Sequence, residues 1–356
     1  MMDCSILDRP QDMAALDSQD MLGHIRALPD QLTAAWQLAM KADLSSLKGI
    51  QKILVAGMGG SAIGADLLAA YLEPICPLPI LIQRDYTLPA WADASSTLVV
   101  ASSHSGNTEE TLSVFSQAQE RGCQILSICT GGELMRRSQA AGIPVIAFQH
   151  HGQPRAAVGY SFGILLGALH RLGLIPDQQA GLEAAVRAMR VQEVSLLPES
   201  PVRENPAKRG AGQLVDRWVM VFGSGLLAPV ARRWKGQISE VAKAWGQFES
   251  LPEADHNTLA GLAYPREQLD RMVALFLEAE SNHPRNLLRS GLTREIFMVE
   301  GIGTDAYKAQ GETRLEQLWT LVHFGDYIAY YLGMIYGVDP TPIEFISGLK
   351  EAMTGA

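Results

Sequence analysis

Apolar runs and amphipathic segments alternate along most of the chain, which is typical of an α/β protein with parallel sheets. Short apolar runs that end at glycine-rich or polar turns predict buried strands, and segments whose apolar residues recur every three or four positions predict helices. In the first half the predicted strands are 52–56, 79–83, 97–102, 124–129 and 143–147. The predicted helices are 61–73, 107–121, 132–141, 159–172 and 180–196. This order predicts a doubly wound α/β domain.

The second half of the chain begins a similar order again, so the pattern predicts two domains. Its predicted elements are helix 205–214, strand 218–222, helix 228–245, strands 272–278 and 295–299, and then long helices to the end. A polar stretch with three prolines, from Pro198 to Pro206, is the best candidate for the boundary. We expect an N-terminal helical segment over 1–45, a first domain over 46–197 and a second over 205–356.

The turn after strand 97–102 is dense in hydroxyl groups and carries a glycine. Residues 102–111 read Ser-Ser-His-Ser-Gly-Asn-Thr-Glu-Glu-Thr and lead into a predicted helix. A helix N-terminus has unpaired N–H groups and partial positive charge, so it can bind an anion without a lysine. The side chains of Ser103, Ser105 and Thr108 can add hydroxyl donors. This run predicts a cradle for the phosphate of a phosphate monoester.

A second glycine-rich turn, residues 57–64, joins strand 52–56 to the next helix. Its candidate ligand contacts are Gly59, Gly60 and Ser61. Because parallel strands end at the same edge of a sheet, this turn and the phosphate cradle are expected to share one crevice. Nothing in the second half matches the cradle, so we expect one phosphate site per chain.

The phosphate cradle has a plainer interpretation as an ordinary helix start. Ser105 or Asn107 would then cap the helix, and Thr108 with Thr111 would only decorate its first turns. The density of hydroxyl groups in the run exceeds what a cap needs. We therefore favour the phosphate site.

Charge and composition narrow the class of protein. The chain has 356 residues and a net charge of −9, which argues against nucleic acid or an anionic membrane as a partner. No apolar run approaches the roughly 18 residues that span a bilayer, and the N-terminus lacks the pattern of a signal peptide. We expect a cytoplasmic protein.

Cysteine and histidine spacing gives no sign of a metal or cofactor. Cys4, Cys76, Cys123 and Cys129 show no zinc-ligand spacing and no disulfide framework. The pair His150-His151 invites a metal interpretation, but neighbouring side chains on an extended segment point in opposite directions. We interpret it as a loop pair and expect neither a metal nor a cofactor.

Further motifs resemble one family, that of the bifunctional phosphoglucose/phosphomannose isomerases with tandem sugar isomerase (SIS) domains. The paired turns at 57–64 and 103–111 are similar to those of the sugar isomerase fold, and the resemblance covers most of the chain after about residue 45. The narrower motifs are Arg84–Pro89, Pro154-Arg155, Trp234–Glu240, Pro252–Asn257 and Asp339–Lys350. The resemblance implies two flavodoxin-like sandwich domains with parallel sheets in a homodimer.

The activity that this resemblance implies is the interconversion of glucose 6-phosphate or mannose 6-phosphate with fructose 6-phosphate. Moving a hydrogen between C1 and C2 needs a carboxylate base, a group that opens the ring, and positive charge beside the enediolate. The matching residues are Glu240 as the base, His256 for ring opening, and Arg155 with Lys350 for the charge. The resemblance also implies that the neighbouring subunit lends His256.

Each of these four residues has a plainer interpretation when it is taken alone. Glu240 would be a solvated helix glutamate, His256 a loop residue and Arg155 a surface arginine. Lys350 would be a cation in the last turn of a helix. The presence of all four together favours an enzyme.

Three departures from the family pattern fall at His104, Val241 and Asp255, and none removes a reacting group. Asp255 lies next to His256 in the sequence, where an acid can raise the pKa of a histidine. The family's device for accepting mannose is a hydroxyl near the C-terminal lysine, for which Thr341 is the nearest candidate.

Two other classes of function compete with the isomerase. A dehydrogenase could use Gly57, Gly59 and Ala62, but no acid ends the second strand about 20 residues on, where a ribose would be bound. A non-catalytic sensor of sugar phosphates is the stronger alternative, since the same cradle can serve a regulator.

Overall fold

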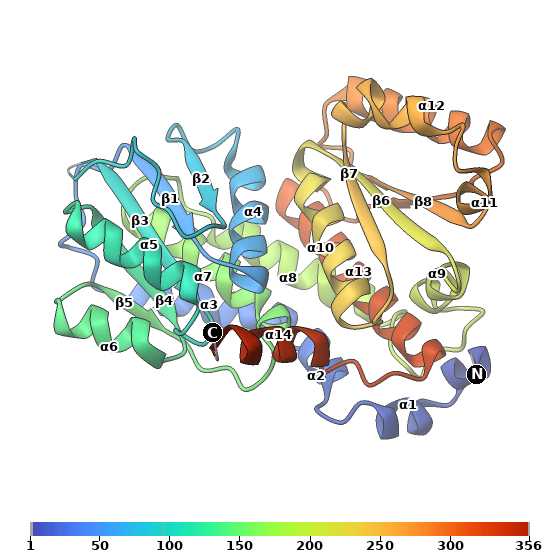
Figure 1. Ribbon diagram of the computed structural model, residues 1–356, viewed down its shortest axis with the longest axis horizontal. Coiled ribbons are helices and arrows are strands. Elements are labelled where there is room, and N and C mark those ends of the chain that lie inside the picture. The colour runs from blue at the N-terminus through green and yellow to red at the C-terminus, as the bar shows by residue number, and fades with distance from the viewer. Residues whose placement is uncertain (1–2, 95, 355–356) are drawn as a thin grey trace.

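The computed structural model describes residues 3–94 and 96–354, which form two parallel sheets with helices packed on them (Figure 1). The first sheet has the strand order β2-β1-β3-β4-β5, the flavodoxin-like order of a doubly wound domain. Its strands are β1 (Lys52–Ala56), β2 (Ile80–Gln83), β3 (Thr97–Ser103), β4 (Gln124–Cys129) and β5 (Val145–Ala147). All five lie where the sequence predicted a strand.

Alternate residues of the central strands enter two different apolar clusters, of which one also contains residues of the second half of the chain. On β1, Ile53 and Val55 belong to one apolar cluster, while Leu54 and Ala56 belong to another. Both faces of a parallel sheet are buried, which is why this strand reads as a continuous apolar run. The helices around the sheet are α4 (Gly59–Leu72), α5 (Glu109–Glu120), α6 (Gly132–Ala140), α7 (Val158–Arg171) and α8 (Gln179–Glu193).

Helices form the N-terminal segment, as its helical spacing predicted. They are the 3-10 helix η1 (Cys4–Asp8), then α1 (Pro10–Leu16), α2 (Met21–Arg26) and α3 (Leu28–Lys41). The apolar face of α3 packs along α7 and buries Leu32 and Trp36. Close contact needs small residues here, because a side chain at Gly163 of α7 would collide with Ala35.

The second sheet is also parallel and has the order β7-β6-β8-β9. Its strands are β6 (Trp218–Ser224), β7 (Gly246–Leu251), β8 (Met272–Glu278) and β9 (Gly303–Lys308). The helices of this half are α9 (Pro206–Gln213), α10 (Ala228–Glu240), α11 (Arg266–Leu269), α12 (Pro284–Val299), α13 (Arg314–Tyr336) and α14 (Glu344–Thr354). Short 3-10 helices include η3 (Gly225–Leu227) and η4 (Glu253–His256).

The strand predicted at 295–299 is wrong, because these residues form the last turns of α12. The run Ile296-Phe297-Met298-Val299 reads as a strand by its apolar character, yet only Phe297 of these four is buried. Pro284 at the first helical position and the ring of His283, which accepts a hydrogen bond from the N–H of Arg285, begin the helix upstream. Its exposed apolar side chains form a stripe on the outside of the molecule.

Strands β7 and β9 were not predicted from the sequence, and the predicted helix 228–245 was too long. These two strands are the edges of the second sheet, so their side chains are largely half-exposed and their sequences are partly polar. Helix α10 instead ends at Glu240 with Val241 as its C-cap, and Lys243, two residues further on, adopts a left-handed backbone conformation with φ of 56°.

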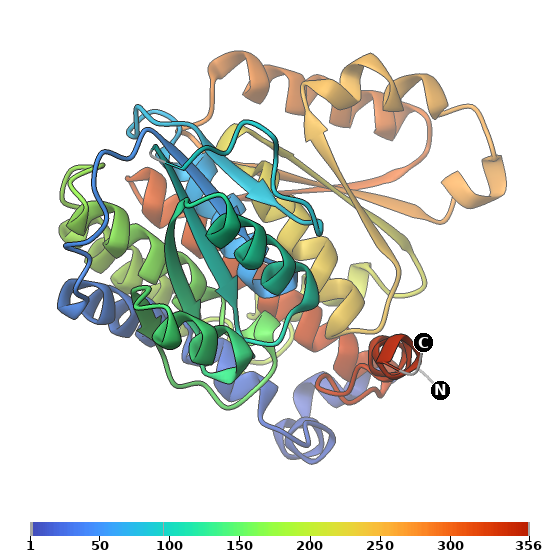
Figure 2. The same ribbon diagram turned by 60° about the vertical axis from the view of Figure 1, so that its left-hand side comes forward.

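Helix α13 joins the two halves of the chain (Figures 1 and 2). It packs against α8 of the first half and against α9 and α10 of the second. Almost every side chain from Leu315 to Ile335 is buried, so the helix is covered on all of its faces. A capping box of Thr313 and Glu316 begins it, and Gly337 in the left-handed conformation ends it.

Candidate active site

A cavity of about 230 Å³ lies between the N-terminal end of α4 and the last three turns of α10. Its lining is strongly basic and contains one carboxylate, that of Glu240. The lining residues are Gly59, Gly60, Ile63, Arg84, Arg155, Arg232, Arg233, Lys235, Gly236, Gln237, Glu240 and Phe248. Four residues that the sequence assigned to the site are therefore brought together here, namely Gly59, Gly60, Arg155 and Glu240.

Gly60 lets the Arg155 turn lie directly on the start of α4. A Cβ atom at residue 60 would stand 2.2 Å from the carbonyl oxygen of Pro154, so no side chain fits. Gly59 adopts a positive φ of 48°, which glycine adopts without strain. The glycines of this turn thus bring backbone N–H groups and Arg155 to the same wall of the cavity.

Arg155 is buried and aimed at Glu240. Its Nη1 lies 3.5 Å from Oε2 of Glu240, and its Nη2 donates to the carbonyl oxygens of Pro340 at 2.9 Å and Thr341 at 2.5 Å. The side chain of Arg155 is 2% exposed, whereas that of Glu240 is 32% exposed and can reach a ligand in the cavity. Burial lowers the pKa of Arg155 from its usual range, and the charge of Glu240 partly offsets this.

Further cations in the cavity wall were not singled out from the sequence as site residues. Arg84 and Arg232 both bind the carboxylate of Asp66, with Arg232 Nη1 at 3.0 Å. Lys235 lines the cavity from the next turn of α10. Helical spacing could have identified Arg232 as a site residue, because residues 232, 236 and 240 are four apart and face the same side of a helix. The cavity therefore suits an anionic ligand.

The phosphate cradle lies at the same edge of the first sheet as the cavity, because β1 and β3 are neighbouring parallel strands. Ser103, Ser105 and Thr108 do not line the cavity itself. Within the cradle, Ser103 Oγ lies 2.8 Å from Thr108 Oγ1 and accepts the N–H of Gly106 at 3.1 Å. These contacts fold the loop so that its hydroxyl groups converge ahead of α5.

The helix-cap interpretation of this run does not fit the structure. The N-cap residue of α5 is Thr108, and its side chain makes no capping hydrogen bond. Ser105 Oγ accepts the N–H of Asn107 at 3.2 Å, and Asn107 Oδ1 accepts the N–H of Glu133 at the start of α6. Neither side chain caps α5, so the first turn of this helix can donate N–H groups to an anion.

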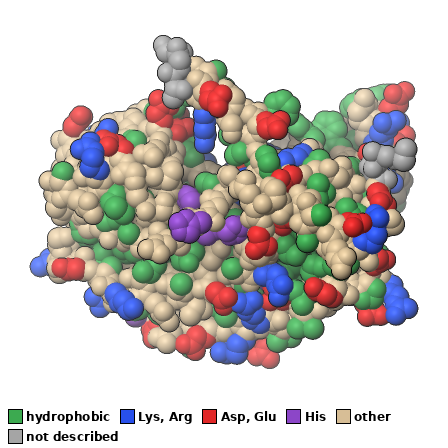
Figure 3. Space-filling model, turned by 90° about the horizontal axis from the view of Figure 1, so that it is seen from below, with side chains coloured by type: hydrophobic (Ala, Val, Ile, Leu, Met, Phe, Trp, Pro, Cys, Tyr) green, Lys and Arg blue, Asp and Glu red, His purple; other side chains and the backbone are tan. Residues whose placement is uncertain are grey.

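Histidines gather beside the cradle and show on the face of the molecule seen from below (Figure 3). Nε2 of His104 lies 2.9 Å from Nδ1 of His150, whose ring contacts that of His24 with a centroid separation of 4.9 Å. Burial, together with the neighbouring histidines, lowers the pKa of His150 to about 4. His104 is one of the three departures from the family pattern. Its contact with His150 connects the cradle to the segment that follows β5.

His256 lies away from this cavity, since none of the described residues that line it is a histidine. It is an exposed residue of η4, beyond the end of β7. The neighbouring Asp255 binds Arg289 Nη1 at 2.9 Å and Thr293 Oγ1 at 2.8 Å, both on α12. The carboxylate of Asp255 therefore fixes the histidine turn to α12.

The remaining predicted residues are not among those that line the cavity. Lys350 is an exposed residue of α14. Thr341 is 2% exposed, and among the described residues its hydroxyl has no hydrogen-bond partner. Ser61 is buried in the first turn of α4. The carbonyl oxygen of Thr341 accepts a hydrogen bond from Arg155, which lines the cavity.

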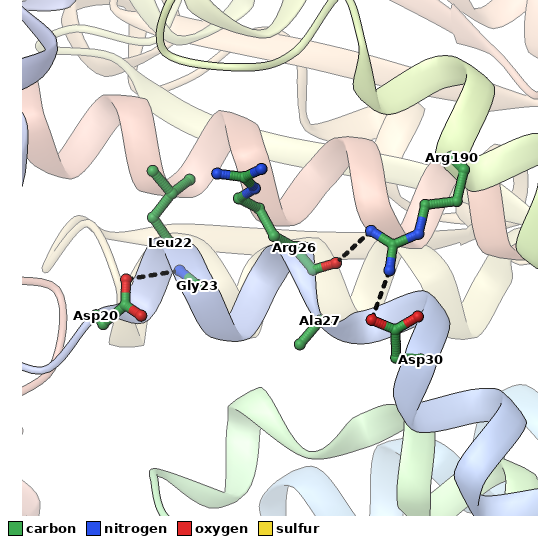
Figure 4. Close-up of a pocket in the computed structure, with 7 residues that line it drawn as sticks. All are labelled: Asp20, Leu22, Gly23, Arg26, Ala27, Asp30 and Arg190. Atoms are coloured by element: carbon green, nitrogen blue, oxygen red, sulfur yellow. Dashed lines mark hydrogen bonds and ion pairs between the residues drawn. The ribbon is translucent and has the colours of Figure 1, made fainter.

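A larger hollow of about 390 Å³ lies over α2, the start of α3 and α8, and its charged groups are already paired (Figure 4). Arg190 binds Asp30 at 2.6 Å and the carbonyl oxygen of Arg26 at 2.9 Å. Asp20 accepts the N–H of Gly23. These contacts hold α2, α3 and α8 together, so we assign the hollow a structural role.

Two further observations concern ligands and membranes. Within residues 3–94 and 96–354, no three or more His, Cys, Asp or Glu side chains are grouped to hold a metal ion. Over the same residues no helix has the length and apolar character to cross a bilayer.

The fold defines a class of protein, that of the sugar isomerase fold. A solved structure of a hypothetical protein from Thermus thermophilus covers 99% of this chain and 95% of its own, with a TM-score of 0.76 at 16% identity. The sequence model described as bacterial phospho-glucose isomerase C-terminal SIS domain matches residues 203–353.

Two curated relatives narrow the class to a family. The bifunctional phosphoglucose/phosphomannose isomerase of Caldicellulosiruptor bescii is 36% identical over 94% of this chain and 98% of its own. The protein with the same name in Aquifex aeolicus is 34% identical over 87% and 92%. The chain belongs to the bifunctional phosphoglucose/phosphomannose isomerase family, which confirms the resemblance.

Proposed function

We propose that this protein interconverts glucose 6-phosphate and mannose 6-phosphate with fructose 6-phosphate by ring opening and a cis-enediol proton transfer. The observation that carries the proposal is the pair of Arg155 and Glu240 in a basic cavity beside the open N-terminus of α5. The names of the curated relatives support the same reaction. A carboxylate base, a fixed cation and an anion site are what this reaction needs.

The phosphate of the sugar would bind at the cradle. Ser103, Ser105 and Thr108 would offer hydroxyl groups, and the first turn of α5 would offer backbone N–H groups. The turn of Gly59, Gly60 and Ser61 would contact the sugar from the other strand end. This division leaves the carbon atoms C1 and C2 free to reach Glu240.

Glu240 would carry the proton between the two carbon atoms. In the aldose-to-ketose direction its carboxylate removes the proton from C2, the C2–H electron pair forms the enediolate, and the proton returns to C1. Arg155 would stabilise the negative charge of the enediolate, because its planar guanidinium presents a cation that remains protonated near neutral pH. Lys350 would supply a second cation when α14 lies over the bound sugar.

Acceptance of mannose 6-phosphate is the finer part of the proposal. The two aldoses differ in the configuration at C2, so the base must reach the C2 hydrogen of either epimer. Thr341 supports this role, because its buried hydroxyl has no partner among the described residues and its carbonyl oxygen binds Arg155. We assign Thr341 to the recognition of the hydroxyl groups near C1 and C2.

We further propose a homodimer in which His256 completes the site of the neighbouring chain and opens the sugar ring. The absence of a histidine among the described lining residues supports this arrangement. The contact surface would be the stripe on α12 formed by Leu288, Leu292, Ile296 and Val299, which are between 43% and 84% exposed. A second copy is the occupant that fits, because Asp255 ties His256 to this same helix.

We place the enzyme in the cytoplasm. Buried Cys123 and Cys129 carry free thiols, as expected in a reducing compartment.

A coupled assay that measures fructose 6-phosphate from glucose 6-phosphate and from mannose 6-phosphate in parallel tests the proposal. We expect turnover of both aldoses. A sugar-phosphate sensor would bind both and convert neither, and turnover of glucose 6-phosphate alone would remove the role given to Thr341.

A further inference from the structure

Lys243 holds the end of helix α10 to a distant part of the chain. Its Nζ donates to the backbone carbonyl oxygen of Glu240 at 2.5 Å and to that of Pro340 at 3.0 Å. Arg155 donates to the same oxygen of Pro340 at 2.9 Å. Both cations therefore bind the carbonyl oxygen of Pro340. Both of them also contact Glu240, Arg155 at its carboxylate and Lys243 at its backbone carbonyl oxygen.

The backbone of Lys243 shows that the position has a constraint beyond helix termination. Its φ of 56° lies in the left-handed region, which glycine adopts without strain, and it lies two residues beyond Val241, the C-cap of α10. Only two other non-glycine residues in the described chain have a positive φ, Asp20 and Asp216. A strained residue that places a charged side chain at a candidate site points to a functional role for that side chain.

Building on the function proposed above, we infer that Lys243 is a positioning residue that holds the carboxylate of Glu240 and the Pro340–Thr341 turn in register. Without the ammonium group, the last turn of α10 loses its link to the turn that leads into α14. The carboxylate of Glu240 can then move away from its position beside the guanidinium group of Arg155. Binding of the phosphate, at the far side of the site, is left unchanged.

The electrostatic setting agrees with this geometry. Burial of the ammonium group, followed by the charge of Arg155, lowers the pKa of Lys243 to about 8, while Asp339 and Glu240 act in the opposite direction. Lys243 is thus charged at neutral pH and becomes neutral as the pH rises through about 8. A neutral amine donates weaker hydrogen bonds, so the hydrogen bonds from Lys243 to the carbonyl oxygens of Glu240 and Pro340 weaken above that pH.

The test compares Lys243→Gly with Lys243→Arg. Glycine relieves the left-handed backbone and removes the cation, so we expect a fold at least as stable as the parent, a kcat about 10-fold lower and a nearly unchanged KM. Arginine keeps a positive charge and hydrogen-bond donors at this position, so Lys243→Arg should retain most of the parental kcat. Asp216→Gly is the matched control, because it relieves the same φ of 56° far from the cavity.

Hydrogen exchange of the backbone N–H groups over 339–343 gives a second readout that does not need activity. We expect faster exchange in Lys243→Gly than in Lys243→Arg and in Asp216→Gly. If the parent protein lacked isomerase activity, the proposed function would be wrong. Hydrogen exchange would still test whether the hydrogen bonds of Lys243 hold the Pro340–Thr341 turn. Parental kcat and parental exchange in Lys243→Gly would overturn the inference, and Lys243→Asn serves if the glycine variant does not fold.

Discussion

At the scale of single residues, the site rests on the pairing of Glu240 with Arg155 across the two halves of the chain. The two residues are 85 positions apart, and their side chains meet because Gly60 admits the Arg155 turn and α10 ends at Glu240. From spacing alone Glu240 looked like a solvated helix residue, so only the family resemblance selected it. No local pattern reveals a partner that the tertiary fold brings from another domain.

Glu240→Gln tests the base directly. The amide keeps the size of the side chain but cannot accept the C2 proton, so we expect kcat to fall about 10²–10⁴-fold with little change in the affinity for fructose 6-phosphate. Steady-state kinetics and ligand binding on the same preparation measure both. Glu249→Gln, on β7 and outside the cavity lining, is the control and should keep parental kcat.

His150 predicts a pH dependence of stability. The folded chain keeps this ring neutral down to about pH 4, against an ordinary value of 6.5, because of burial and of His104, His24 and His151 around it. Unfolding therefore takes up a proton between these values, and the free energy of unfolding falls as the pH falls from 6.5 to about 4.

Denaturation curves of the parent and of His150→Gln across this range check the effect. We expect a shallower loss of stability in the variant, while the same change at an exposed histidine that is not among the groups around His150, His256→Gln, keeps the parental slope. Equal slopes in all three proteins would show that burial and the neighbouring histidines do not hold the ring of His150 neutral.

At the scale of elements, the sequence predicted every strand of the first sheet and the central strands of the second, and it missed the two edge strands of the second sheet. Strands such as β1 and β3 are covered on both faces, so burial selects a continuous apolar run that is easy to recognise. The edge strands β7 and β9 are half-exposed and partly polar, and nothing in their composition separates them from loops. The error at 295–299 has the opposite cause, an apolar run that stays exposed on α12.

The loop before α5 makes the second element-scale prediction. Ser105→Ala combined with Thr108→Val should weaken the binding of phosphate-bearing ligands by about 2–4 kcal/mol, taking each charge-assisted hydroxyl contact at roughly 1–2 kcal/mol. Calorimetric titration with fructose 6-phosphate and with inorganic phosphate measures this. Thr111→Val on the same helix is the control, because its buried hydroxyl has no partner among the described residues. Parental affinity in the double variant would disprove the cradle.

At the scale of the whole molecule, Glu240, the proposed base, lines the cavity, and His256, the proposed ring-opening group, does not line it in the same copy. Mixing inactive Glu240→Gln and His256→Ala chains, with exchange of subunits, should restore up to about a quarter of the parental activity, because half of the dimers are mixed and each has one intact site. Demonstrated heterodimers without activity would place both residues in the site of one chain.

The α12 stripe gives an independent test of the same assembly. Leu292→Glu with Ile296→Glu should yield a monomer with little activity, because two charges would be buried in the contact. Light scattering and the coupled assay measure both properties. Val191→Glu, on the 75% exposed Val191 of α8, should change neither. A dimer that survives the α12 change would place the contact elsewhere.

Proton transfer between C1 and C2 is the central step of the proposed reaction, and NMR spectroscopy of the reaction in deuterated water measures it. Incubation of the parent protein with fructose 6-phosphate should place deuterium on C1 of the ketose and on C2 of the aldoses, because the proton on Glu240 exchanges with solvent during the enediol step. The Glu240→Gln protein should leave the sugar unlabelled. Conversion by the parent without any deuterium would mean a hydride shift, and it would contradict the mechanism.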